Sequence, residues 1–205
     1  MPLSSSQGGV FRMNRSYALF AVALALAAGL WLATFLGVSD GMRVIADSRM
    51  QSQQQVHTVT FQTGVSPEGY DGTTDTYLNA NFPNRKYDSY DPGLLWVRST
   101  GLQRGLVKFD LSQHIPLDAE VLAVTLTLRV QSRSPSGLSM RVLCYQVLQP
   151  WMESEATWND AQAGYPWWGG GGCGGISRED TPVAQVDVSG WAQDVTLDVA
   201  AAVQG

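Results

Sequence analysis

Aromatic side chains in glycine-rich or polar loops are the residues of this chain best suited to binding chemistry. Tyr165, Trp167 and Trp168 lie in the glycine-rich segment 161–175. Neighbours in an extended segment point to opposite faces, so one tryptophan is expected to be buried and the other exposed. The exposed one, together with Tyr165, would offer flat faces for the C–H groups of a sugar ring. Tyr87 and Tyr90, which follow a loop rich in Asn and Asp, are also candidates, and anchoring of the loops is the structural alternative.

Trp151 and Trp158 bracket an acidic loop that holds Glu153, Glu155 and Asp160. We expect these tryptophans to fill the core at the rim of the domain, with a stacking platform as the alternative. The paired carboxylates of a glycosidase stand about 5–10 Å apart across a cleft, and one short loop does not show such a cleft. We therefore expect Glu153 and Asp160 to accept hydrogen bonds from backbone amides or to pair with arginine.

The sequence contains no Ser-His-Asp order, nucleophile elbow, phosphate-binding loop or dinucleotide fingerprint. It therefore predicts a protein that is not an enzyme, with a polysaccharide hydrolase or lyase as the alternative. Four aspartates in the polar loops could supply oxygen ligands to Ca²⁺: Asp71, Asp75, Asp88 and Asp91. Their spacing matches no EF-hand loop, and Asx turns account for such residues. No obligatory cofactor is predicted, and Ca²⁺ stays open.

The chain has two cysteines, Cys144 in an expected strand and Cys173 among the glycines. Outside the cytoplasm a disulfide is allowed, and closing a loop of about 28 residues stabilises a fold by roughly 3 kcal/mol in the chain-entropy model. The alternative is that Cys144 is buried as a small apolar residue. Because a thiol flanked by glycines would otherwise be exposed and reactive, we predict a bridge between the two.

The apolar run from Tyr17 to Val38 carries no charge, and its length of about 22 residues is enough for a helix that spans a bilayer. Arg12 and Arg15 precede it, so the positive-inside rule places residues 1–16 in the cytoplasm. Residues 39–56 are polar and predict a stalk. The domain at 57–205 would then be membrane-anchored and face the extracytoplasmic side, or be secreted if the run is a cleaved signal.

Composition and periodicity predict the fold of that exported domain. Only 15% of the residues are charged and 21 are glycine, which suits many short strands joined by glycine turns. Even-numbered residues from Leu122 to Val130 are apolar, whereas Thr125, Thr127 and Arg129 lie on the other face, as in a half-buried strand. The predicted class is all-β, an antiparallel jelly-roll β-sandwich preceded by one transmembrane helix. A net charge of −5 leaves no basic face for nucleic acid.

Several short motifs follow one another in an order that resembles a known family. They are Asp75-Thr76-Tyr77, Asn81-Phe82-Pro83-Asn84, Phe109-Asp110-Leu111-Ser112, Ile115-Pro116, Ala123 to Leu128, Trp151-x-Glu153, Thr157-Trp158-Asn159, Gly164 with Trp167, Leu197-Asp198-Val199 and Val203-Gln204. In this order and spacing the chain resembles the disaggregatase-related (DNRLRE) domain, over roughly Thr58 to Gly205.

The resemblance implies a jelly-roll β-sandwich on secreted or surface proteins, often beside polysaccharide-active or adhesive domains; some relatives are classed as carbohydrate-binding modules. Relatives usually continue past the Val-Gln turn into a last strand, so that strand is expected to be missing here or supplied by a partner. The expected function is a surface-exposed, non-catalytic module that binds polysaccharide or cell-surface glycan. The alternative is a structural or adhesive subunit that acts as a spacer or assembles by strand exchange with a protein partner.

Overall fold

The computed structural model describes residues 10–26, 55–89, 94–98, 100–116, 118–134, 139–190 and 192–203; for 10–26, 55 and 132–134 it describes the backbone alone. The longer strands are β1 (Val10–Leu26), β2 (Gln55–Phe61), β3 (Thr73–Asn79), β4 (Leu94–Arg98), β5 (Gln103–Phe109), β6 (Glu120–Ser134), β7 (Met140–Cys144), β10 (Ala184–Val188) and β11 (Gln193–Asp198). The short elements are β8 (Asp160–Gln162), β9 (Tyr165–Pro166) and the 3-10 turns η1 (Gly175–Ser177) and η2 (Ala200–Ala202). The described chain is therefore all-β, as predicted.

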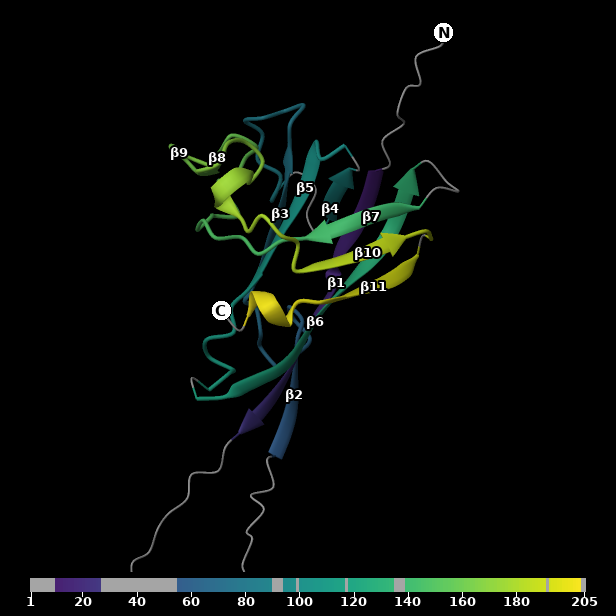
Figure 1. Cartoon of the computed structure of the whole chain (residues 1–205), viewed down its shortest axis with the longest axis vertical. Coiled ribbons are helices and arrows are strands. Elements are labelled where there is room, and N and C mark those ends of the chain that lie inside the picture. The colour runs from purple at the N-terminus through teal and green to yellow at the C-terminus, as the bar shows by residue number, and fades with distance from the viewer. Residues whose placement is uncertain are drawn as a thin grey trace, which may run out of the picture.

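The largest sheet is organised around β1 (Figure 1). This strand pairs antiparallel with β6 along one side, while its other side pairs with β4 at residues 10–14 and with β2 at residues 20–26. The fifth strand, β11, pairs with the far side of β6. Three smaller antiparallel pairs complete the fold: β10 with β7, β3 with β5, and β8 with β9.

Strand β6 shows the predicted alternation. Val124, Leu126, Leu128 and Val130 are buried, and they share one hydrophobic cluster with Met140, Val142 and Val188 of β7 and β10 and with Val195 and Leu197 of β11. Leu122 is 44% exposed, so the buried row begins at Val124, two residues later than the pattern indicates. The period of two thus buries one face of the strand beneath the β7–β10 pair.

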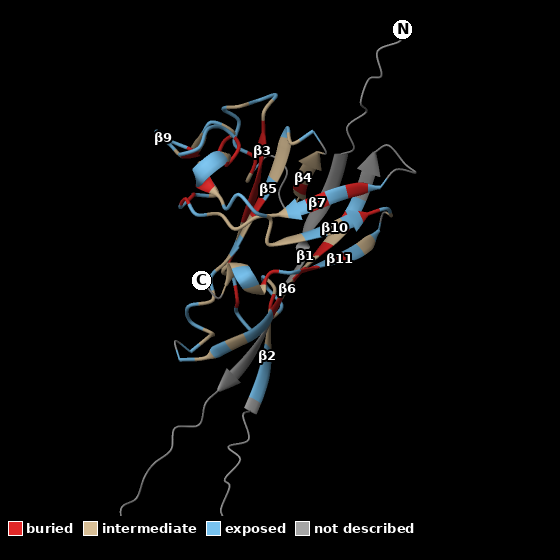
Figure 2. Cartoon of the chain, in the orientation of Figure 1, coloured by how far each residue is buried: buried red, intermediate tan, exposed pale blue. Residues whose placement is uncertain are grey.

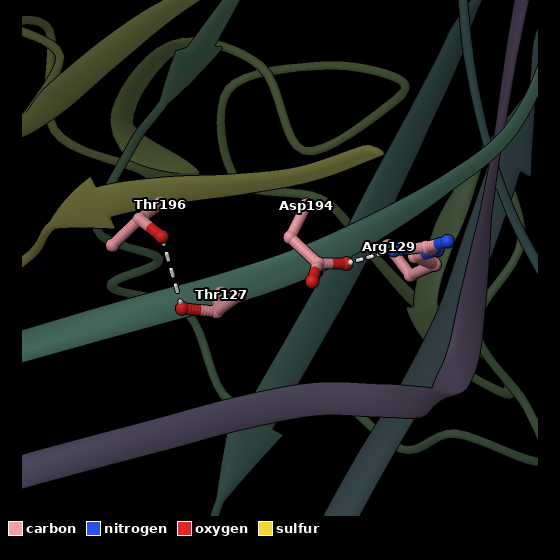
Figure 3. A network of polar contacts seen from close by, with 4 residues as sticks. All are labelled: Thr127, Arg129, Asp194 and Thr196. Carbon is pink, nitrogen blue, oxygen red and sulfur yellow. Dashed lines mark hydrogen bonds and ion pairs between the residues drawn. The ribbon is translucent and has the colours of Figure 1, made fainter. Parts of the chain in front are cut away.

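The opposite face of β6 carries polar side chains that pair with β11 (Figure 3). The hydroxyls of Thr127 and Thr196 are 3.2 Å apart, and Arg129 Nη1 lies 3.1 Å from Asp194 Oδ1. Both are directly opposed cross-strand pairs, the arrangement that fixes the register between two strands. The polar face predicted for Thr127 and Arg129 is confirmed.

The N-terminal segment differs from the prediction. The expected transmembrane helix spans 17–38, but residues 17–26 form the second half of β1, and 27–38 lie outside the described residues, as do 39–54 of the expected stalk. A continuous apolar run suits a strand in the middle of a sheet as well as a membrane helix, because both satisfy every backbone polar group. Within the described ranges, no helix is long and apolar enough to cross a bilayer.

Candidate functional site

A second hydrophobic cluster supports the loops at one end of the domain, around β8 and β9 (Figure 1). It contains Leu78, Leu106, Trp151, Ala156, Ala161, Trp167 and Cys173. Two of its members come from β3 and β5, and β3 is buried along nearly its whole length (Figure 2). The loops between 147 and 177 therefore rest on a packed base formed by that strand pair.

Of the adjacent tryptophans Trp167 and Trp168, one is buried and the other is exposed, as predicted. Trp167 is only 3% exposed, and its Nε1–H donates a hydrogen bond to the carbonyl oxygen of Thr157 at 2.9 Å. Trp168 is 59% exposed and Tyr165 is 63% exposed. The loop thus presents two large aromatic rings to solvent, three positions apart in the sequence, and uses the buried ring between them as an anchor. We call Tyr165 and Trp168 the aromatic pair.

The buried side chain of Gln149 holds the backbone of Trp168. Its Oε1 accepts hydrogen bonds from the backbone N–H of Trp168 at 2.7 Å and from the Ser177 hydroxyl at 3.0 Å. Its Nε2 donates to the carbonyl of Pro166 at 3.0 Å. Ser177 in turn accepts from the N–H of Gly169 at 3.1 Å. Gln149 and Ser177 therefore fix three loop segments at the base of Trp168, a role that sequence reasoning missed.

The glycine-rich loop is wrapped closely around Trp158. A Cβ at Gly172 would lie 2.6 Å from the Trp158 ring, and one at Gly171 would lie 2.5 Å from its Nε1. The guanidinium of Arg104 sits 5.1 Å from the ring centroid and donates from Nη1 to the carbonyl of Gly172 at 2.7 Å. The glycine-rich loop thus packs around the Trp158 ring. Trp151 is buried. Both tryptophans therefore have the structural role that the sequence predicts.

Two arginines pack against aromatic rings beside the glycine-rich loop. Arg178 stacks at 3.6 Å over the ring of Tyr145, and Arg104 is held beneath the loop by Trp158 and Gly172. Burial lowers the pKa of Arg104, and the neighbouring charge of Arg178 lowers it further. Among the described residues neither arginine has a carboxylate partner, in contrast to Arg129 and Arg141 of the strands. The two arginines therefore lie beside a loop region whose own charged residues are Glu153, Glu155 and Asp160.

Two predicted stacking residues are corrected by their burial. Tyr87 is 3% exposed, its ring centroid lies 4.1 Å from that of Tyr77, and its hydroxyl accepts a hydrogen bond from Asn79 Nδ2 at 3.2 Å. Trp167 is the buried anchor described above. Because another ring or the core covers them, neither can stack against a ligand in this structure. Tyr90 lies outside the described residues.

The three predicted calcium ligands that the structure describes, Asp71, Asp75 and Asp88, belong to no recognisable metal site. Asp75 is buried in β3, Asp71 is exposed and Asp88 is half-buried, while Asp91 lies outside the described residues. In the part of the chain that the structure describes, no three His, Cys, Asp or Glu residues form a group that could hold a metal ion. Calcium binding stays a prediction that no geometry supports.

The acidic loop uses its carboxylates to hold backbone. Glu153 Oε1 accepts a hydrogen bond from the N–H of Asp75 at 3.0 Å, and Glu155 Oε2 accepts one from the N–H of Ala163 at 3.0 Å. The role expected for Glu153, acceptance from a backbone amide, is confirmed. These bonds tie the loop to β3 and to the turn before β9.

The predicted disulfide is not formed, because Cys144 and Cys173 are free thiols. Cys144 packs against the main hydrophobic cluster, whereas Cys173 belongs to the second cluster. Burial raises the pKa of Cys144 and raises that of Cys173 to about 11. Each cysteine therefore packs as a small apolar residue in its own cluster. The Cys173 thiol is shielded from solvent by burial and not by a disulfide.

Comparison of the chain with protein-family models, with curated proteins and with solved structures found no match. The class of protein is therefore defined by what the structure shows. It is an all-β domain with a preformed loop platform at one end, on which two aromatic rings are exposed and a third is buried.

Proposed function

We propose that this protein is a non-catalytic surface module that binds polysaccharide or cell-surface glycan through Tyr165 and Trp168. The observation that carries the proposal is the exposure of these two rings on a loop that Gln149, Ser177 and Trp158 hold in place. Sugar rings present C–H groups that pack on aromatic faces, and a fixed platform loses little entropy when a ligand binds. The likeness of the motifs to the DNRLRE domain adds support.

We place the domain on the extracytoplasmic side, held at the membrane by the apolar run 17–38. The absence of charge from that run, and the arginines before it, support this location. A spacer or adhesive subunit that assembles by strand exchange is the second candidate function. It is favoured by the position of β1, a single strand that joins β6 to β2 and β4 at the centre of the largest sheet.

Affinity electrophoresis of the full-length protein in gels that contain neutral or acidic polysaccharides tests the proposal. We expect retardation by at least one polymer, and a loss of roughly tenfold in affinity for Trp168→Ala and for Tyr165→Ala, since one aromatic contact contributes about 1 kcal/mol or more. The matched control is Leu122→Ala, which removes an exposed apolar side chain from β6.

The proposal fails if no polymer retards the wild-type protein, or if the Leu122 variant loses as much affinity as the Trp168 variant. Circular dichroism spectra that match the wild type show that the variants are folded. A protein that binds no polymer but forms mixed oligomers between differently tagged copies would favour the adhesive subunit instead.

A further inference from the structure

The position of β1 makes it the element on which the largest sheet depends. Within the described residues, β2 and β4 have no ladder partner other than β1, and β6 has β1 on one side and β11 on the other. Removal of β1 would leave β6 facing β2 and β4 across the width of one strand, with unpaired N–H and C=O groups on both sides. We call this the strand slot; such edges pair readily with an extended chain.

A long connection separates β1 from its partner β2. Residues 27–54 connect the end of β1, Leu26, to Gln55, with which Leu26 is directly paired. A hairpin loop needs about 2–5 residues, so this connection is far longer than the pairing requires. The connection is therefore long enough for β1 to leave its place beside β2 while the chain stays continuous.

The ladder of β1 is interrupted where its sequence turns apolar. The pairing with β6 passes from Asn14 opposite Arg129 to Leu19 opposite Thr127, so that four residues of β1 face one residue of β6. The apolar run begins at Tyr17, within this interruption. The section from 19 to 26 is thus a separate part of the ladder, and its composition is that of a membrane span.

The length of the apolar run shows that residues 17–26 cannot lie in the sheet and in a bilayer at the same time. With residues 17–26 in the sheet, the apolar run retains 27–38, which as a helix would measure about 18 Å. The hydrocarbon core of a bilayer is about 30 Å thick. The span therefore needs the residues that β1 uses, and one copy of the segment cannot serve both purposes.

We propose that residues 17–26 have two mutually exclusive positions, the centre of this sheet and a lipid bilayer, and that the membrane-inserted form carries an open strand slot. The inference rests on the proposed attachment to the membrane. In the inserted form the slot takes one extended segment antiparallel to β6, and the segment that fits its register is 10–26 of a second copy of this chain. The occupant of the slot thus sets whether the protein is held at the membrane or released from it.

A cross-link across β1 and β6 tests the proposal. Ala23 lies directly opposite Ala123, so the double variant Ala23→Cys/Ala123→Cys can lock the segment in the sheet. Full-length protein is purified in detergent, treated with an oxidant or a short bis-maleimide, and reconstituted into phosphatidylcholine vesicles. The matched control is Thr127→Cys/Thr196→Cys, which links β6 to β11 and leaves β1 free. Each single variant shows whether the native thiols or pairs of copies react.

Flotation of the vesicles gives the readout. We expect unlinked protein and the β6–β11 control to float, and at least tenfold less of the β1–β6 linked protein to do so; reduction of its disulfide restores flotation. Linked protein that floats like the control overturns the inference, as does failure of the β1–β6 pair to link where the control pair links. Wild-type protein that never floats refutes the proposed location instead, so the two failures are distinguishable.

Discussion

Replacement of Gln149 by leucine tests how the aromatic pair is held. Leucine keeps much of the volume of the side chain and removes its polar atoms. Three hydrogen bonds are lost: those from the Trp168 N–H and the Ser177 hydroxyl, and the one to the Pro166 carbonyl. Ser177 is fully buried, so its hydroxyl cannot turn to water in exchange.

The magnitude follows from these bonds. A buried hydrogen bond contributes about 0.5–1.5 kcal/mol net, and a partner left unsatisfied costs more. Gln149→Leu is therefore expected to lower the free energy of unfolding by about 2–4 kcal/mol. With a urea m-value of about 2 kcal/mol/M, the midpoint of unfolding falls by about 1–2 M.

Urea titration of the full-length protein, followed by tryptophan fluorescence, measures the change. Gln185 is exposed on β10, and Gln185→Leu is the control, with an expected effect below about 0.5 kcal/mol. A midpoint for Gln149→Leu that coincides with that of the control, at an unchanged m-value, would refute the reasoning. It would mean that water replaces the hydrogen bonds of Gln149 without loss of stability, and that Gln149 does not hold the backbone of Trp168 in place.

Gly172 and Gly164 both have left-handed backbone, at φ values of 73° and 77°, but only a Cβ at Gly172 would meet the Trp158 ring. We expect Gly164→Ala to cost about 1 kcal/mol of stability and Gly172→Ala about 3 kcal/mol or more; equal losses in urea titrations would contradict the close packing. The pKa of Cys173 rises from 9.0 to about 11 on folding, so its thiol ionises first in the unfolded chain and its contribution to stability is complete below pH 9. Between pH 9 and 11 that contribution is lost, by about 2 kcal/mol at pH 10.5. Unfolding curves of wild type and Cys173→Ala should diverge over this window, and parallel curves would contradict the burial of the thiol.

The parts of the fold that follow from local pattern could be predicted from the sequence. The alternation in β6 depends only on the period of the strand. The burial of Trp167 and the exposure of Trp168 match the expectation for neighbouring residues, although Trp168 lies in a turn in which the Gly170 N–H donates to the Trp167 carbonyl. Both predictions are confirmed by the burial of the residues concerned.

The rest depends on contacts between residues far apart in the chain. Tyr87 is buried because Tyr77 of another segment packs on its ring, and Gln149 is buried because Pro166, Trp168 and Ser177 satisfy it. No spacing in the sequence indicates such partners. The predicted disulfide assumes that Cys173 is exposed, whereas the glycine-rich loop packs around Trp158 and buries Cys173 without a bridge.

The order of synthesis gives the pairing of β1 with β6 a further consequence. Val22 is directly opposite Val124, about 100 residues later in the chain, and at 5–20 residues per second a ribosome needs roughly 5–20 s to bridge that interval. Throughout this time the first apolar segment exists without the strand that it will join. Contacts of such high contact order form late in folding. In a nascent chain made beside a membrane, this segment would therefore contact lipid before β6 is synthesised. The speed of translation would then influence whether the segment enters the bilayer or the sheet.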